Sequence, residues 1–180
     1  MKKEVLFAGF GGQGLLFAGK ILAYAALFDG KELSWLPSYG PEMRGGTANC
    51  SVCLSDEPVA CPLVTEPDYL VAMNKPSFAK FLGAARKGGL VLVDSTMVDD
   101  ETTREDVKMI RLPATEVTGQ NGCEGMANMM LLGRLLAETK LVTREAVEYA
   151  LHQVIPPKRA HLIEANLRAL QLGVASAAAV

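Results

Sequence analysis

The chain has 180 residues, of which 49% are hydrophobic, and a formal net charge of −2. This length is enough for one domain with a sizeable core and too short for two. The charge balance argues against a nucleic-acid-binding face, which needs clustered basic residues, and no apolar run reaches the ~20 residues of a membrane span. Glycines interrupt the N-terminal apolar run, unlike a signal peptide, so we expect a cytoplasmic protein.

The first two thirds of the chain alternate between strand and helix patterns. Short apolar runs, each bounded by turn residues, predict strands at 4–10, 32–36, 47–54, 68–73, 90–93 and 107–112. Helical periodicity predicts helices at 15–28 and from 75 to about 85. The wholly apolar run Leu90–Val93 is typical of a strand that is buried on both faces in a parallel sheet.

From Met126 onward the periodicity is helical. Helices are expected at 126–138, after Thr143 as an N-cap, and from about 160 to 172. The whole pattern predicts an α/β fold, in which a mostly parallel sheet is flanked by helices and a C-terminal helical cap closes the chain.

A glycine-rich loop, Gly9–Gly14 (GFGGQG), lies between the first strand and the first helix. Its glycines match the dinucleotide-binding pattern, and free backbone N–H groups at such a helix start bind anions. The acidic residue that should hold a ribose at the end of the second strand is missing, because Asp29 precedes that strand and Glu32 begins it. Nicotinamide binding is therefore disfavoured. A pyrophosphate site and a purely structural tight turn both remain open.

Gln13 is an unusual residue inside this glycine loop. Its amide carries both donors and an acceptor, so it can reach a ligand or a neighbouring chain. The alternative is that it pairs with the backbone of the adjacent loop.

A second glycine-rich loop, 38–46 (SYGPEMRGG), follows the second strand. Arg44 either holds a carboxylate or phosphate of a ligand or pairs locally with Glu42. Because both loops follow strands, we expect them to lie side by side at the carboxyl edge of the sheet, where α/β sheets bind ligands. Neither loop offers a nucleophile with a base and an orienting group, so no catalytic residue is expected in this chain.

The four cysteines are Cys50, Cys53, Cys61 and Cys123. Cys50 and Cys53 form a CxxC pair, but residues three apart on a strand point to opposite faces. Two small buried side chains are therefore favoured over an iron–sulfur or zinc site, and no metal site is expected.

The two loops, together with Ser55–Pro58, Pro113–Glu116 and Ala127–Gly133, resemble the gamma subunit of 2-oxoacid:ferredoxin oxidoreductases of the 2-oxoglutarate, pyruvate and ketoisovalerate type. The likeness covers essentially the whole chain, which implies a single Rossmann-like gamma-type domain over 1–180. Enzymes of this family decarboxylate 2-oxo acids on thiamine diphosphate and pass electrons through [4Fe–4S] clusters to ferredoxin. Coenzyme A takes the acyl group.

The resemblance implies a part of an enzyme that is inactive alone. Alpha and beta subunits would hold thiamine diphosphate, a ferredoxin-like delta subunit would hold the clusters, and 2-oxoglutarate is the preferred substrate. The pyrophosphate of coenzyme A would lie on the first loop, with Arg44 or Lys20 adding charge. The expected cofactor-binding residues are Gly9, Gly11, Gly12, Gln13, Gly14, Tyr39, Arg44 and Gly45.

Two other classes of function remain open. One is a stand-alone nucleotide-dependent oxidoreductase, for which Tyr39 is the only proton-donor candidate in the loops. The other is a non-catalytic docking module. In the leading interpretation the isolated chain would expose a surface that the complex buries, so we expect it to form a homodimer.

Overall fold

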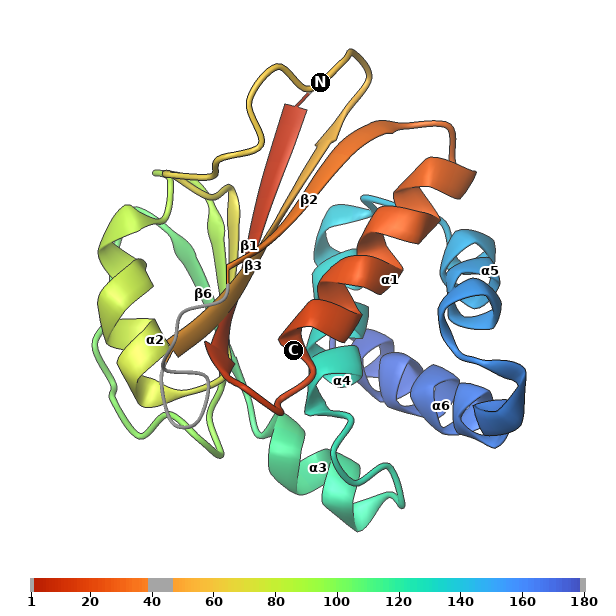
Figure 1. Cartoon of the computed structure of the whole chain (residues 1–180). Helices are drawn as coiled ribbons and strands as arrows, with labels where there is room; N and C mark the ends of the chain where they lie inside the picture. The colour runs from red at the N-terminus through yellow and green to blue at the C-terminus, as the bar shows by residue number, and fades with distance from the viewer. Residues whose placement is uncertain (1, 39–46, 179–180) are drawn as a thin grey trace.

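A computed structural model describes residues 2–38 and 47–178. Within these residues the strands form one sheet in the order β2-β3-β1-β4-β5-β6 (Figure 1). The strands are β1 Lys2–Phe10, β2 Glu32–Ser38, β3 Thr47–Ser55, β4 Tyr69–Ala72, β5 Leu90–Asp94 and β6 Lys108–Leu112. The pairs β1–β4, β4–β5 and β5–β6 are parallel, whereas β3 pairs antiparallel with both β1 and β2.

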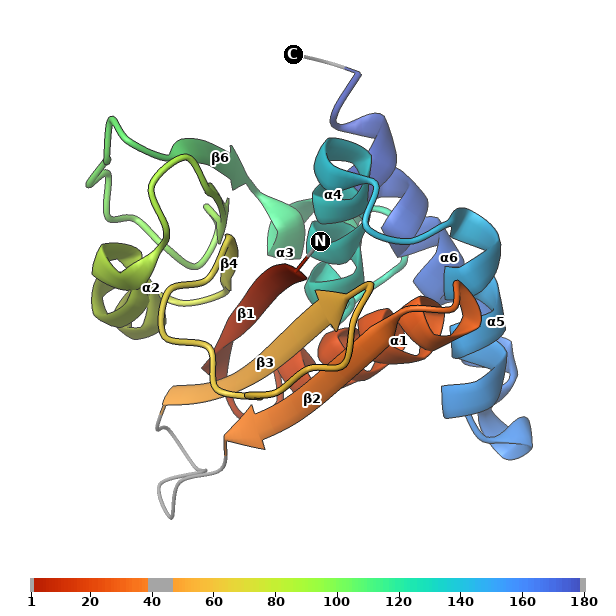
Figure 2. The ribbon, with the colours of Figure 1, turned by 90° about the horizontal axis from the view of Figure 1, so that it is seen from above.

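Helices cover both faces of this sheet. They are α1 Leu15–Phe28, α2 Lys75–Phe81, α3 Ala114–Gln120, α4 Ala127–Thr139, α5 Arg144–Val154 and α6 His161–Ala175, with short 3₁₀ helices at Leu82–Ala84 (η1) and Pro157–Arg159 (η2). Helices α1, α4, α5 and α6 lie on one side of the sheet, and α2 lies on the other (Figures 1 and 2). No helix in the described ranges is long and apolar enough to cross a bilayer.

Side chains of the central strands alternate between the two faces of the sheet, and this alternation produces two hydrophobic cores. On β1, Val5 and Phe7 belong to the larger core beneath α1 and α4, whereas Leu6 and Ala8 belong to the smaller core with Phe78 of α2. Successive strand residues point to opposite faces, so both faces of β1 are buried. This two-sided burial explains the continuous apolar runs of the central strands.

The α/β fold predicted from the sequence is confirmed, and the predicted C-terminal helices are α4, α5 and α6, which form a layer with α1. Thr143 caps α5 as expected, since its hydroxyl accepts a hydrogen bond from Ala146 N at 3.2 Å. Helix α3 was not predicted. Its sequence, ATEVTGQ, contains two threonines and a glycine, which are poor helix formers.

A buried carboxylate explains why α3 nevertheless forms. Asp94, which is fully buried at the end of β5, accepts hydrogen bonds from the Thr115 hydroxyl at 2.6 Å and from the Thr115 backbone N–H at 3.3 Å. This contact satisfies a donor at the start of α3 that would otherwise be unpaired. A tertiary interaction therefore overrides the weak local propensity.

Two glycines set the distance between α4 and α6. A Cβ added to Gly133 would overlap the carbonyl oxygen of Leu170, and one added to Gly173 would overlap that of Met130. The two helices therefore pack backbone to backbone, and neither position has room for a methyl group.

We expect Gly133→Ala and Gly173→Ala each to lower the free energy of unfolding by at least about 2 kcal/mol, because α4 and α6 must separate. Gly119→Ala in α3 is the matched control. A Cβ there meets nothing within 4 Å, so this substitution should stabilise the chain by about 0.5–1 kcal/mol through helix propensity. Urea denaturation of the three variants checks this; equal effects at all three positions would contradict the packing.

Candidate functional site

The glycine loop turns the chain from β1 into α1. Gly12 has φ +96° and Gly14 has φ +75°, conformations that a residue with a side chain adopts poorly. A Cβ on Gly12 would meet nothing within 4 Å, whereas one on Gly14 would lie 2.5 Å from Asn128 Nδ2. The backbone of Gly12 is therefore open to a ligand, and Gly14 is packed against α4.

The N-terminus of α1 is uncapped by any side chain of the described residues. Gly14 is its N-cap residue, and its first turn holds no acidic side chain. The first intrahelical hydrogen bond runs from Ala18 N to Gly14 O at 3.0 Å. The N–H groups before Ala18 are thus free of helical partners, and together with the helix dipole they fit an anion such as a pyrophosphate.

Sheet topology places this loop where α/β sheets bind ligands. After β1 the chain passes to α1 on one face, and after the neighbouring parallel strand β4 it passes to α2 on the other. Ligands of open α/β sheets bind at the carboxyl ends of two strands whose connections diverge in this way. The glycine loop thus occupies the expected position.

The second loop begins and ends at the same edge of the sheet. Ser38, which ends β2, pairs with Asn49, and Thr47, which begins β3, pairs with Phe10 at the end of β1. The loop residues proposed to bind the ligand, Tyr39, Arg44 and Gly45, lie outside the described residues. Their roles stay predictions.

The Gln13 amide joins the glycine loop to the end of β4. Its Oε1 accepts a hydrogen bond from Phe10 N at 2.6 Å, and its Nε2 donates to Met73 O at 2.8 Å. Asn74, which caps α2, also donates to Oε1 at 3.4 Å. Of the two interpretations of Gln13, the structure shows pairing with the backbone of an adjacent loop.

Gly9 makes room for this amide. A Cβ on Gly9 would lie 2.5 Å from Gln13 Oε1. We expect Gly9→Ala to destabilise the chain mainly by displacing Gln13, so the double variant Gly9→Ala/Gln13→Ala should lose at least about 1 kcal/mol less than the sum of the two single losses. Thermal or urea denaturation of the wild type, the two single variants and the double variant measures this coupling. Strictly additive losses of stability would exclude it.

Lys20, proposed to add charge to the site, lies on α1 beyond its first turn. Its Nζ is 5.6 Å from the centre of the Tyr24 ring. This cation–π contact occupies the ammonium group, and no described contact joins it to the glycine loop.

A cavity of about 360 Å³ opens beside Gly14. Its walls come from the starts of α1 and α4 and from the α5–α6 connection, including Arg159. Arg159 and this connection were not anticipated from the sequence. The only local signal was a basic pair, Lys158-Arg159, after two prolines, and its proximity to Gly14 depends on the packing of α6.

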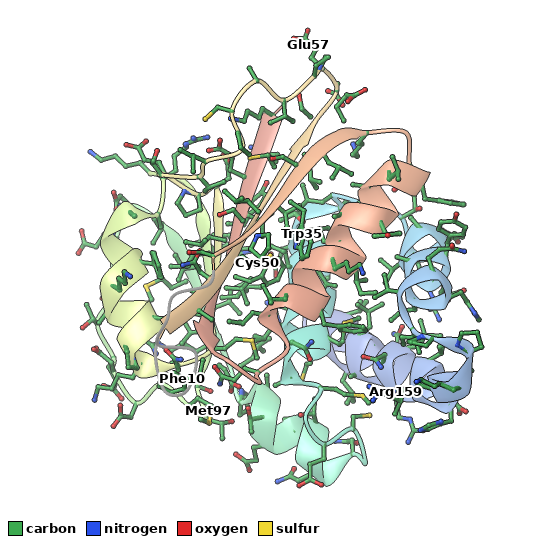
Figure 3. All side chains as sticks on the ribbon, viewed as in Figure 1. Phe10, Trp35, Cys50, Glu57, Met97 and Arg159 are labelled. Atoms are coloured by element: carbon green, nitrogen blue, oxygen red, sulfur yellow. The ribbon has the colours of Figure 1, made fainter. Side chains whose placement is uncertain are left out.

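Cys50 and Cys53 are buried on opposite faces of β3, as predicted. Cys50 Sγ accepts a hydrogen bond from Trp35 Nε1 at 2.9 Å on the α1 side (Figure 3), whereas Cys53 Sγ lies 4.0 Å from Glu4 Oε1. Burial raises the pKa of the Cys50 thiol to about 12. Within the described ranges, no group of three His, Cys, Asp or Glu side chains could hold a metal ion.

The raised pKa of Cys50 makes folding sensitive to alkaline pH. Above the ordinary thiol value of 9.0 the unfolded chain loses this proton, whereas the folded chain keeps it until about pH 12. The contribution of this thiol to the free energy of unfolding is therefore fully present below pH 9 and is lost as the pH rises toward 12. Cys50→Ala should flatten the pH dependence of unfolding by up to about 1.4 kcal/mol per pH unit in that window. Cys61→Ala, at an exposed position, is the control; equal slopes in both variants would contradict this.

The fold is an α/β sheet with a glycine loop between its central strand β1 and helix α1. A family model described as pyruvate ferredoxin/flavodoxin oxidoreductase matches residues 4–176. The chain therefore belongs to this family. It is a gamma subunit of the 2-oxoacid:ferredoxin oxidoreductase type, as the resemblance implied.

Relatives and solved structures agree with this membership. The 2-oxoglutarate synthase subunit KorC of Methanocaldococcus jannaschii is 40% identical over 87% of this chain and 85% of its own. The ketoisovalerate oxidoreductase subunit VorA of Methanothermobacter marburgensis is 46% identical over 74% of this chain, but the match spans only 28% of VorA. The gamma subunit of a keto/oxoacid ferredoxin oxidoreductase from Geobacter sulfurreducens superposes with a TM-score of 0.84 at 32% identity, covering 99% of both chains.

Proposed function

We propose that this gamma subunit serves a complex that oxidises 2-oxoglutarate. KorC relatives from Methanocaldococcus jannaschii and Methanothermobacter thermautotrophicus match over 85% and 94% of their own length, at 40% and 38% identity. The VorA match, in contrast, is confined to part of a longer chain. The pyruvate/ketoisovalerate common gamma subunit of Thermococcus litoralis also matches over 84% of its own length, but at only 29% identity. Among these relatives of similar length, the higher identity of the KorC subunits favours 2-oxoglutarate as the substrate.

The partners would be alpha and beta subunits holding thiamine diphosphate, a ferredoxin-like delta subunit holding [4Fe–4S] clusters, and ferredoxin as the electron acceptor. Anaerobic purification of the complex through this chain, with thiamine and iron assays, tests the partners. Dye reduction by the purified complex should be fastest with 2-oxoglutarate. Faster reduction with pyruvate or ketoisovalerate would overturn the proposal that 2-oxoglutarate is the substrate. A chain that purifies alone would overturn the proposed assembly with these partners.

Within that complex we propose that the glycine loop binds the pyrophosphate of coenzyme A. The observation that carries this proposal is the uncapped N-terminus of α1 beside the open backbone of Gly12. Backbone N–H groups and the helix dipole stabilise a phosphate there without any basic side chain. Coenzyme A supplies such a group, whereas the missing acid at the end of β2 disfavours a nicotinamide dinucleotide.

The test compares Gly12→Asp with Gly12→Asn in the assembled complex. Both side chains have the same shape and tolerate positive φ better than most, so both variants keep the loop. The added carboxylate should repel the pyrophosphate and raise the KM for coenzyme A about tenfold or more relative to Gly12→Asn. Equal KM values in the two variants would exclude the loop as the pyrophosphate site.

A further inference from the structure

The cavity beside Gly14 offers a binding site that the glycine loop alone does not explain. We propose that it holds the adenosine 3′-phosphate end of coenzyme A, with Arg159 as the anchor of the 3′-phosphate. This inference rests on the proposed binding of the coenzyme A pyrophosphate by the glycine loop. The volume of the cavity, about 360 Å³, falls in the range of small-molecule sites, about 300–1,000 Å³.

The walls of the cavity fit the flat faces of an aromatic ring. Phe17 of α1, Met126 at the start of α4, and Ile155, Pro156 and Leu162 around the α5–α6 connection supply apolar surface. Surfaces of this kind bind a purine ring by burial of its faces, and a few convergent polar groups then fix its orientation.

Two buried amides supply those polar groups. Asn128 is 4% exposed and donates from Nδ2 to Gly14 O at 3.0 Å, and Asn166 is 6% exposed and donates from Nδ2 to Leu162 O at 2.8 Å. Both residues line the cavity, and neither amide oxygen accepts a hydrogen bond from the described residues. A free amide oxygen is an acceptor, and the exocyclic amine of adenine is a donor.

Arg159 supplies positive charge at the cavity. It lies in η2, directly before α6 (Figure 3), and within the described part of the chain its guanidinium makes no hydrogen bond or ion pair. A guanidinium that lines a cavity and has no partner among the described residues can bind a phosphate, because its planar N–H donors match phosphate oxygens.

One cavity thus borders two separate anion-binding features. Gly14 marks the uncapped start of α1 on one wall, and Arg159 lies on another. The nucleotide end of coenzyme A likewise carries two separate anionic groups, the 5′-pyrophosphate and the 3′-phosphate, on a ribose whose C1′ bears the flat adenine ring. The cavity therefore offers one anion-binding feature for each of the two charged groups of this ligand.

The experiment uses the assembled complex and two acceptors, coenzyme A and 3′-dephospho-coenzyme A. The measured quantity is the KM for the dephospho compound divided by the KM for coenzyme A. In Arg159→Ala this ratio should fall about tenfold relative to the wild type, because only coenzyme A has the phosphate that Arg159 binds. Arg159→Lys should have a ratio between those of the wild type and Arg159→Ala.

Lys158→Ala is the matched control. It removes the same charge from the neighbouring exposed residue, which does not line the cavity, so it should leave the ratio unchanged. A ratio that is the same in wild type and Arg159→Ala would overturn the cavity proposal. If Gly12→Asp still weakens coenzyme A binding in that case, the glycine-loop proposal survives; if neither variant affects coenzyme A, both proposals fail.

Discussion

The hydrogen bonds of the Gln13 amide hold the candidate site in place. They join Phe10 at the end of β1 to Met73 at the end of β4, so the loop between β1 and α1 cannot move independently of the neighbouring strand. Gly9 provides the space for this amide, and Gly12 and Gly14 provide the positive φ values that bring α1 to the edge of the sheet. With this turn fixed, the start of α1 faces outward with its first N–H groups free.

The helical layer contributes residues to the site that are far from the glycine loop in the sequence. Asn128 of α4 donates to Gly14 O, 114 residues away in the sequence. Gly133 and Gly173 bring α6 close against α4, and the α5–α6 connection that carries Arg159 precedes α6 directly. Close packing of two helices thus determines whether an arginine far from the loop in sequence can reach its cavity. The packing of α4 against α6 therefore determines which side chains line the candidate site.

The sequence was enough to predict the central strands, the helices with strong periodicity and the glycine loop, because each depends on local pattern. It did not reveal α3, whose short segment depends on the buried carboxylate of Asp94. Nor did it reveal Arg159, since only tertiary packing brings that residue near Gly14. The partners of Gln13 lie partly 60 residues away, so sequence alone left its two interpretations open.

Hydrogen–deuterium exchange of the assembled complex, with and without coenzyme A, tests the central claim most directly. The claim is that the free N–H groups at the start of α1 receive the ligand. Amides of residues 14–17 should exchange markedly more slowly when coenzyme A is bound, because a phosphate then accepts their hydrogen bonds. Unchanged exchange in this segment, with coenzyme A bound and protection elsewhere in the complex, would contradict the claim.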